Sequence, residues 1–329
     1  MTASPQISSA RFAVVGATGL VGETLLALLA EQGVPAAQVL ALASAESAGR
    51  HVSYGATTLV VEAAGPAAMT GRDVVFFAAT DGLAAELAPA AVEAGAFVID
   101  KSATFRADAS VPLVIPALNG HLLDAAPRLV SSPNCTTIGV AHVLGALARV
   151  AEIGRVTLTT LQSASGAGRR GLEALAVERA GREVADSPFA ARLVDNVVPL
   201  VGALDAEGVS SEERKLCHEL RRLLERPALE VDATCIRVPT AVGHTASLRV
   251  AVRLSLAAAR AALVAAPPVE WIEGCPTPAA VVGTDRVLVG RLRSAANGDL
   301  LLVQCADNLR RGAATNALEC AARLLSARA

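Results

Sequence analysis

The pattern of apolar and polar residues predicts two different kinds of sheet. In the first third of the chain, short continuous apolar runs at residues 11–15, 39–43, 73–79 and 97–100 alternate with segments of helical periodicity. Continuous apolar runs are typical of parallel strands that helices cover on both faces. The alternation of strand and helix therefore predicts a doubly wound α/β domain.

Beyond residue 150 the apolar period changes to two. Residues 155–161 and 247–254 alternate between apolar and polar, which is typical of antiparallel strands with one buried face. The runs at 287–293 and 300–303 flank Asn297-Gly298, a strong hairpin signal. A helix within 205–224 begins after the N-cap Ser210, and another helix occupies 307–327. We expect an α+β second domain with a mostly antiparallel sheet.

Composition restricts the classes of partner. The 329 residues suffice for two domains, 53% are apolar, and the net charge of −2 includes no basic block. We therefore expect neither a nucleic-acid nor a membrane partner. Six scattered cysteines show neither metal-ligand nor disulfide spacing, which favours a reducing cytoplasm and no metal. Residues 1–6 are expected to be a short disordered N-terminal segment. Every cysteine except Cys135 is expected to pack in the protein interior.

A glycine-rich turn joins the first strand to the first helix. Gly16, Gly19 and Gly22 permit a tight turn, close approach of a pyrophosphate and close packing of helix on strand. The N-terminus of the helix then faces the phosphates. We therefore predict a Rossmann-like domain whose residues Gly16, Thr18, Gly19, Val21 and Gly22 bind a dinucleotide.

The residues after the second strand bear on the choice of cofactor. Ser44, Ser47 and Arg50 suit the 2′-phosphate of NADP(H), whereas a carboxylate often holds the ribose hydroxyl of NAD(H). Glu46 would repel a phosphate unless it simply points to solvent. The sequence favours NADP(H) and leaves NAD(H) open because of Glu46.

A lone cysteine follows a turn of serine, proline and asparagine and opens a long apolar helix. At a helix N-terminus the unpaired N–H groups and the macrodipole favour the thiolate, which is the nucleophilic form. Cys135 is thus a candidate nucleophile, and the alternative is a small buried hydrophobic residue. Downstream, Arg237 lies in an apolar strand, where a buried cation needs a partner.

Several short motifs follow one another over nearly the whole chain: Gly16-Ala17-Thr18-Gly19, Phe105-Arg106, Pro133-Asn134-Cys135-Thr136-Thr137, Gln162 with Ser165-Gly166-Ala167-Gly168, Ile236-Arg237-Val238-Pro239 with Gly243-His244, and Asp307-Asn308-Leu309. In type and order these motifs resemble those of aspartate-β-semialdehyde dehydrogenase. The resemblance implies a dinucleotide domain at 10–134, completed by the helix at 307–329, and a catalytic and dimerisation domain at 135–306. It also implies a homodimer or a tetramer.

The resemblance implies a reaction in the biosynthesis of lysine, threonine and methionine. L-Aspartyl-4-phosphate and NADPH give the semialdehyde, NADP⁺ and phosphate. Cys135 would form a thioacyl enzyme, His244 would be the general acid/base, and Gln162 would orient the acyl group. Arg237 would bind the substrate carboxylate and Glu212 its ammonium group. Arg106 and Lys215 would bind the phosphate, and Asn134 would lie beside the nucleophile. Ser165, Gly166 and Asn308 would bind the cofactor.

Alternatives remain because the chain departs from the family pattern. The segment between Gly168 and Ser210 is short, with Phe189 where the family has a tyrosine- and asparagine-containing stretch, and no acidic residue follows His244 closely. A non-catalytic paralogue, one with an altered substrate, or an enzyme similar to N-acetyl-glutamyl-phosphate reductase would also fit. The retained Cys135 and His244 favour an enzyme.

Overall fold

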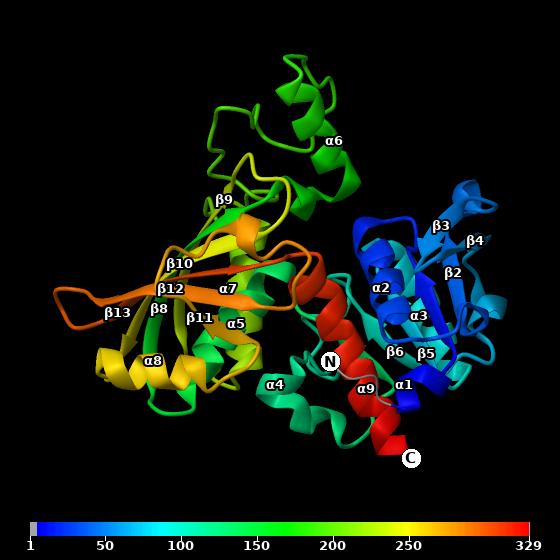
Figure 1. Cartoon of the computed structure of the whole chain (residues 1–329), viewed down its shortest axis with the longest axis horizontal. Helices are drawn as coiled ribbons and strands as arrows, with labels where there is room; N and C mark the ends of the chain where they lie inside the picture. The colour runs from blue at the N-terminus through cyan, green and yellow to red at the C-terminus, as the bar shows by residue number, and fades with distance from the viewer. Residues whose placement is uncertain (1–4, 329) are drawn as a thin grey trace. The chain divides into compact units, whose positions relative to one another are not determined.

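The computed structural model describes residues 5–328, which form two compact units (Figure 1). Residues 5–133 and 313–328 form the first unit, and Asn134–Gly312 form the second. Each unit contains its own sheet, with seven strands in the first and six in the second. The second unit is therefore continuous in sequence, whereas the first is built from two separate stretches.

The first unit contains a seven-stranded sheet in the order β3-β4-β2-β1-β5-β6-β7. The strands are β1 (Phe12–Val15), β2 (Val39–Ala43), β3 (His51–Tyr54), β4 (Thr57–Ala63), β5 (Val74–Phe77), β6 (Phe97–Asp100) and β7 (Leu129–Ser131). All neighbours are parallel except β3 and β4, which form an antiparallel pair that the sequence did not predict. Chain order reverses on the two sides of β1, so the doubly wound prediction is confirmed.

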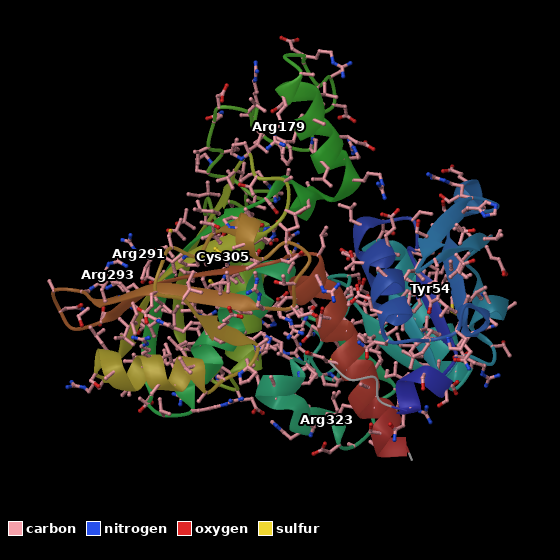
Figure 2. All side chains as sticks on the ribbon, in the orientation of Figure 1. Tyr54, Arg179, Arg291, Arg293, Cys305 and Arg323 are labelled. Carbon is pink, nitrogen blue, oxygen red and sulfur yellow. The ribbon has the colours of Figure 1, made fainter. Side chains whose placement is uncertain are left out.

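Helices cover both faces of this sheet. They are α1 (Pro5–Ser9), α2 (Leu20–Glu31), α3 (Asp81–Glu93), α4 (Pro116–Asn119) and α9 (Asn316–Arg328), with short turns η1 (Ala36–Gln38), η2 (Ala45–Ser47), η3 (Pro66–Met69) and η4 (Gly120–Leu123). Apolar residues of α2 and α9 share one core with the sheet, and those of α3 share another. Tyr54, labelled in Figure 2, is buried on β3 and donates to the Val34 carbonyl at 2.7 Å.

The N-terminal prediction is only partly testable. Pro5 and Gln6 belong to α1, so the expected disorder is wrong there, and residues 1–4 lie outside the described part. The helix is anchored because Ile7 is buried in the core that contains α9.

The second unit contains a six-stranded sheet in the order β11-β12-β13-β10-β8-β9. The strands are β8 (Ile153–Gln162), β9 (Glu230–Arg237), β10 (His244–Val252), β11 (Val269–Trp271), β12 (Val287–Ser294) and β13 (Leu300–Ala306). The pairs β8–β9 and β11–β12 are parallel and the other three are antiparallel, which confirms a mostly antiparallel sheet. The predicted hairpin around Asn297-Gly298 joins β12 to β13.

The helices of the second unit are α5 (Cys135–Ala148), α6 (Gly168–Arg179), α7 (Ser211–Leu223) and α8 (Leu256–Val264), with short turns η5 (Ala164–Ala167) and η6 (Pro278–Ala280). The helices α5, α7 and α8 contact the sheet strands, and Ser210 caps α7 through a reciprocal capping box with Glu213. Burial alternates along β8, so one face of the sheet stays open. Within residues 5–328, no helix combines the length and apolarity needed to cross a bilayer.

Two further predictions need correction. The segment at 307–327 is not one α-helix, because a π-helical turn, η7 (Arg310–Thr315), precedes α9. Cys275 is exposed and does not pack, since it lies in the loop between β11 and η6. Cys235, Cys305 and Cys320 are buried as expected, and Cys217 is partly buried.

Candidate active site

The glycine turn of the first unit leaves no room for side chains. Gly16 has φ +87°, and a Cβ placed on it would lie 2.3 Å from the Ala78 carbonyl oxygen. A Cβ on Gly22 would lie 2.1 Å from the carbonyl oxygen of Gly16. Gly19 is the N-cap of α2, and Thr18 and Val21 are partly buried beside it. The turn lies at the carboxyl end of β1, where chain order reverses and ligands bind in such sheets.

The predicted 2′-phosphate residues lie at the carboxyl end of the neighbouring strand. Ser44 and Glu46 are exposed and Ser47 is partly buried, in and before the turn η2. Since β1 and β2 are parallel, this segment and the glycine turn share one edge of the sheet. The residues fit a dinucleotide with its pyrophosphate at α2 and its adenosine ribose near Ser44.

Two cations follow β6 in the first unit. Arg106 Nη2 donates to the carbonyl oxygen of Lys101 at 2.5 Å. Lys101 Nζ donates to Ser132 Oγ at 2.8 Å and to the Pro133 carbonyl at 3.1 Å, and so fixes the chain two residues before Cys135. Lys101 was not predicted from the sequence, although a cation directly after a parallel strand is a usable signal.

Cys135 is the first residue of α5, as the turn pattern predicted. Asn134 caps the helix, since its Oδ1 accepts from the backbone N–H of Thr136 at 2.8 Å. Its Nδ2 donates to Glu212 Oε1 at 2.8 Å, and its backbone N–H donates to Glu219 Oε2 at 2.7 Å. Two carboxylates of α7 therefore hold the residue that precedes the thiol. Glu219 is buried and was missed, although it lies seven residues from Glu212 on the same helix face.

The thiol of Cys135 faces an imidazole. His244, the first residue of β10, places Nε2 at 3.4 Å from Cys135 Sγ. The ring is buried, and burial together with the Arg237 guanidinium lowers the pKa of His244 to about 3 against a small opposing effect of the Gly243 backbone. His244 is therefore neutral at pH 7.

Arg237 and Gln162 end the adjacent strands β9 and β8 in register with each other. Arg237 Nη1 donates to the Ser163 carbonyl at 2.7 Å, and its guanidinium carbon lies 5.8 Å from the centre of the Phe189 ring. Burial lowers the pKa of Arg237, with Cys135 and Glu212 among the opposing charges. Gln162 is buried and donates to Thr160 Oγ1 at 3.2 Å.

The loop after β8 approaches these groups closely. A Cβ on Gly166 would lie 2.6 Å from Arg237 Nη1 and 3.2 Å from His244 Cε1. Ser165 and Asn308 are buried and hydrogen-bonded to each other, with Asn308 Nδ2 donating to Ser165 Oγ at 3.0 Å. Thus the small-residue loop, predicted as a cofactor contact, packs directly on the histidine and arginine.

The second unit thus gathers most of the expected catalytic and substrate residues. They are Cys135, His244, Gln162, Asn134, Glu212 and Arg237. Lys215 lies three residues from Glu212 on α7, and within the described part of the chain it makes no hydrogen bond or ion pair. Arg106 belongs to the first unit. A nucleophile beside a neutral imidazole, with a buried guanidinium and a carboxylate nearby, suits covalent acyl transfer on a small charged substrate.

Two family models match consecutive parts of the chain. The model described as "Semialdehyde dehydrogenase, NAD binding domain" matches residues 11–126, and "Semialdehyde dehydrogenase, dimerisation domain" matches residues 144–311. The first match covers the glycine turn, and the second contains Gln162, Arg237 and His244.

Curated relatives and solved structures agree with these matches. The aspartate-semialdehyde dehydrogenase of Corynebacterium melassecola is 35% identical, with 95% of this chain and 98% of the relative covered. That of Streptomyces akiyoshiensis is 37% identical, with 94% and 97% covered. The crystal structure of aspartate semialdehyde dehydrogenase II complexed with ASA from Vibrio cholerae has a TM-score of 0.91 at 32% identity, with 96% of this chain and 98% of that chain covered.

Proposed function

The chain belongs to the aspartate-semialdehyde dehydrogenase family and is an enzyme of that class, and we propose that it reduces L-aspartyl-4-phosphate to L-aspartate 4-semialdehyde with NADPH. The observation that carries the proposal is the 3.4 Å contact between Cys135 Sγ and His244 Nε2 at the start of α5. A thiol in this position can form a covalent acyl enzyme. The reaction would contribute to the biosynthesis of lysine, threonine and methionine.

Charged groups around the thiol suit the two ends of an aspartyl substrate. The Arg237 guanidinium would bind the α-carboxylate, because its planar fork matches two carboxylate oxygens. Glu212 would bind the α-ammonium through the carboxylate that Asn134 already orients. Lys215 and Arg106 would bind the leaving phosphate. Asn134 would lie beside the nucleophile, and Gln162 would orient the acyl group.

The chemistry divides into two steps at Cys135. Its sulfur attacks the acyl carbon, and the C–O bond to phosphate breaks, so that a thioester remains on the enzyme. Gly16, Gly19 and Gly22 would hold the pyrophosphate of NADPH, and the bound cofactor would supply the hydride that reduces the thioester. The resulting oxyanion reforms the carbonyl and releases the sulfur of Cys135. His244, whose Nε2 lies 3.4 Å from the sulfur, would be the general acid/base that takes up the thiol proton. Ser165, Gly166 and Asn308 are proposed to line the nicotinamide side.

The central experiment tests turnover and the covalent intermediate. In the reverse direction, phosphate-dependent reduction of NADP⁺ with aspartate semialdehyde should be observed for the wild type. Cys135→Ala should abolish it and Cys135→Ser should impair it severely, whereas equal turnover in all three proteins would refute the proposal. Intact-mass measurement after exposure to substrate should detect an adduct on the wild type only. A non-catalytic paralogue would bind dinucleotide without this adduct.

A substrate panel tests the specificity. N-Acetyl-glutamate semialdehyde has no free amine, so Glu212 would have no cation to bind, and we expect it to react poorly. A preference for that substrate would instead assign the chain to the N-acetyl-glutamyl-phosphate type of reductase.

A second comparison tests the cofactor. We propose NADP(H) because Ser44 and Ser47 can donate hydrogen bonds to a 2′-phosphate. The carboxylate of Glu46 is exposed and would repel a 2′-phosphate, which favours NAD(H). Steady-state rates with NADP⁺ and NAD⁺ should favour NADP⁺, and Glu46→Gln should increase the ratio. A wild-type preference for NAD⁺ that Glu46→Gln leaves unchanged would contradict this assignment.

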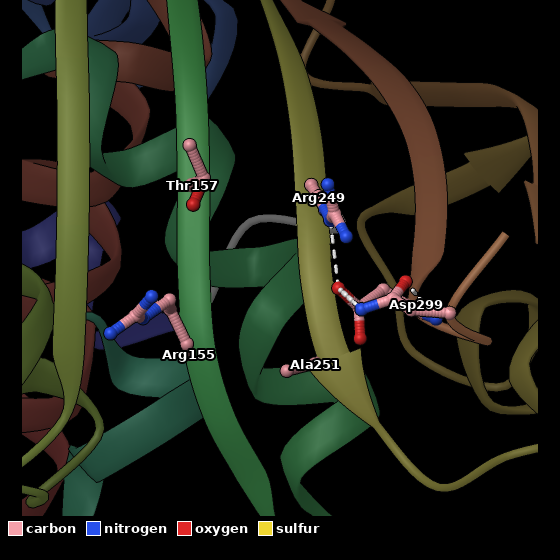
Figure 3. Close-up of a pocket in the computed structure, with 6 residues that line it drawn as sticks. Arg155, Thr157, Arg249, Ala251 and Asp299 are labelled. Carbon is pink, nitrogen blue, oxygen red and sulfur yellow. Dashed lines mark hydrogen bonds and ion pairs between the residues drawn. The ribbon is translucent and has the colours of Figure 1, made fainter. Parts of the chain in front are cut away.

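We also propose that the chain forms a homodimer through the open face of the second sheet. This face carries Arg155 and Thr157 of β8 and Arg249 of β10, around a polar depression of about 460 Å³ (Figure 3). By register Thr157 and Arg249 pair near the middle of their strands, five residues from Gln162 and His244, and the residues that line the depression do not include the catalytic groups. Thr157→Arg should give a monomer by light scattering, and an unchanged mass would contradict the interface.

A further inference from the structure

A buried glutamate of α6 holds the loop that follows this helix. Glu178 lies in the last turn of α6 and is 4% exposed. Its Oε2 accepts from the backbone N–H of Leu193 at 2.8 Å and from that of Val194 at 2.9 Å. Burying a carboxylate is costly unless hydrogen-bond donors compensate it, and these two amides do so. Glu178 therefore fastens a strap, formed by residues 187–198, to the helix.

The strap contains a sharp turn directly after the amides that Glu178 binds. Asn196 Nδ2 donates to the Arg192 carbonyl at 2.8 Å and closes the turn. Asp195 has φ +58°, a left-handed conformation that residues other than glycine rarely adopt. Such a conformation persists only where the surroundings fix the backbone, and the carboxylate of Glu178 fixes the two residues before it.

The strap contacts Arg237 at two places. Near its end, the Val198 N–H donates to the Arg237 carbonyl at 3.0 Å, and the Arg237 N–H donates to the Val198 carbonyl at 2.8 Å. Near its start, the ring of Phe189 faces the guanidinium, with 5.8 Å between the ring centre and Cζ. The electrons of an aromatic face attract a cation at this distance. Both the backbone and the side chain of Arg237 therefore rest on the strap.

Apolar packing joins the strap to the helix. One buried cluster combines residues of the strap with residues of α6: Phe189, Leu193, Val198, Ala174 and Leu175. In Figure 1, α6 and the loop after it project from one end of the second unit. Apolar burial is not directional, so the cluster by itself does not fix the orientation of the strap. The hydrogen bonds to Glu178 supply that direction.

We infer that Glu178 is a positioning residue for Arg237, and that it acts through the strap to aim the guanidinium at the substrate α-carboxylate. This inference rests on the proposed function, which assigns that carboxylate to Arg237. Nη1 already donates to the Ser163 carbonyl at 2.7 Å, so one edge of the guanidinium is held by the end of β8. The strap holds its face. With an edge and a face both fixed, the other N–H groups keep the single direction that a two-point contact with a carboxylate requires.

Steady-state kinetics separate positioning from stability. Glu178→Ala removes the acceptor of two buried amides and loosens the strap, so we expect KM for aspartate semialdehyde to rise roughly tenfold. KM for phosphate, whose proposed ligands lie outside the strap, should change by less than about twofold. A purely structural loss would reduce the amount of active enzyme, and hence the apparent kcat, without changing KM. An unchanged KM for aspartate semialdehyde therefore overturns the inference.

Two matched variants serve as controls. Glu178→Gln keeps an oxygen that can accept from both amides, so KM should stay within about threefold of the wild-type value. Glu173→Ala removes an exposed glutamate from the same helix and should leave KM unchanged. A Gln variant as impaired as the Ala variant would contradict a role as hydrogen-bond acceptor.

A double-mutant cycle tests the route through Arg237. In Arg237→Ala the strap has no guanidinium to position. Glu178→Ala should therefore lower kcat/KM per folded enzyme roughly tenfold in the wild-type background and have almost no effect in the Arg237→Ala background. Equal losses in the two backgrounds would show that Glu178 acts on another group.

Hydrogen exchange, followed by nuclear magnetic resonance, measures the contact without turnover. The amides of Leu193 and Val194 should be protected in wild type and in Glu178→Gln, and should exchange at least about tenfold faster in Glu178→Ala. This pattern in a protein that does not oxidise aspartate semialdehyde would reject the proposed function and leave the Glu178 contact standing. Normal turnover with unprotected amides would reject the contact and leave the proposed function intact.

Discussion

Two neutral histidines buried in the second unit should make that unit sensitive to acid. His142 lies inside α5 and accepts a hydrogen bond from Arg311 Nη1 at 3.4 Å. Burial, with Arg311 and Arg149, lowers the pKa of His142 from 6.5 to about 3, as burial and Arg237 do for His244. The experiment compares the stability of wild type and of His142→Gln as the pH is lowered from 8 to 5.

The sign follows from the lowered pKa. Both rings stay neutral in the folded state, whereas the unfolded chain binds protons below about pH 6.5, so stability is complete above that pH and falls as the pH decreases towards 3. For one histidine, RT ln(1 + 10^1.5) gives a loss of about 2 kcal/mol at pH 5. The two together should lower the free energy of unfolding by about 4 kcal/mol.

Trp271 provides the assay because it is the single tryptophan of the chain and lies on β11 of the same unit. Urea denaturation followed by its fluorescence at several pH values gives the free energy of unfolding. Other titrating groups contribute equally to both proteins, so the difference between their pH slopes isolates His142 and should be about 2 kcal/mol between pH 8 and 5. Identical slopes would refute the argument that His142 is neutral in the folded state.

Three further outcomes follow from the packing. Gly22→Ala should weaken dinucleotide binding at least about tenfold in a calorimetric titration, because its Cβ would strike the Gly16 carbonyl, whereas Gly82→Ala, with nothing within 4 Å, should not. Ser210→Ala should lower the free energy of unfolding by about 1 kcal/mol in urea titrations through loss of the α7 cap, and an unchanged midpoint would contradict this. Glu219→Ala should reduce kcat more than Glu219→Gln, because glutamine still offers an acceptor to the Asn134 N–H, and equal losses would argue against that role.

The sequence predicted those parts of the fold that are encoded by local pattern. β1, β5 and β6 are continuous apolar runs, and both of their faces are buried. The β3–β4 hairpin was missed because it lies at the sheet edge, where β4 is largely exposed and shows little apolar signal. The π-helical turn η7 was missed for a different reason. Its composition suits an α-helix, and a Cβ on Gly312 would lie 2.8 Å from the Cys135 carbonyl, a contact that only the folded chain reveals.

Some residues of the candidate site could likewise be predicted from the sequence, and others could not. Side chains with distinctive chemistry, such as Cys135 and Arg237, could be selected from the sequence by residue type and setting. The contact of Glu219 with Asn134 spans 85 positions, and nothing local separates this glutamate from its neighbours on a charged helix. The backbone N–H groups that bind Glu178 could not be selected at all, because every residue except proline carries one. Partners of this kind emerge only from the tertiary structure.

The two-part origin of the first unit has a consequence for synthesis on the ribosome. Its core includes Ala317, Leu318 and Leu324 of α9, which are translated only after the whole second unit. Residues 5–133 therefore leave the ribosome with one face of their sheet covered by α2 but without α9, while the second unit is complete in sequence at Gly312. During translation the nascent first unit exposes part of its apolar core until α9 has been made, and exposed apolar surface of this kind favours aggregation.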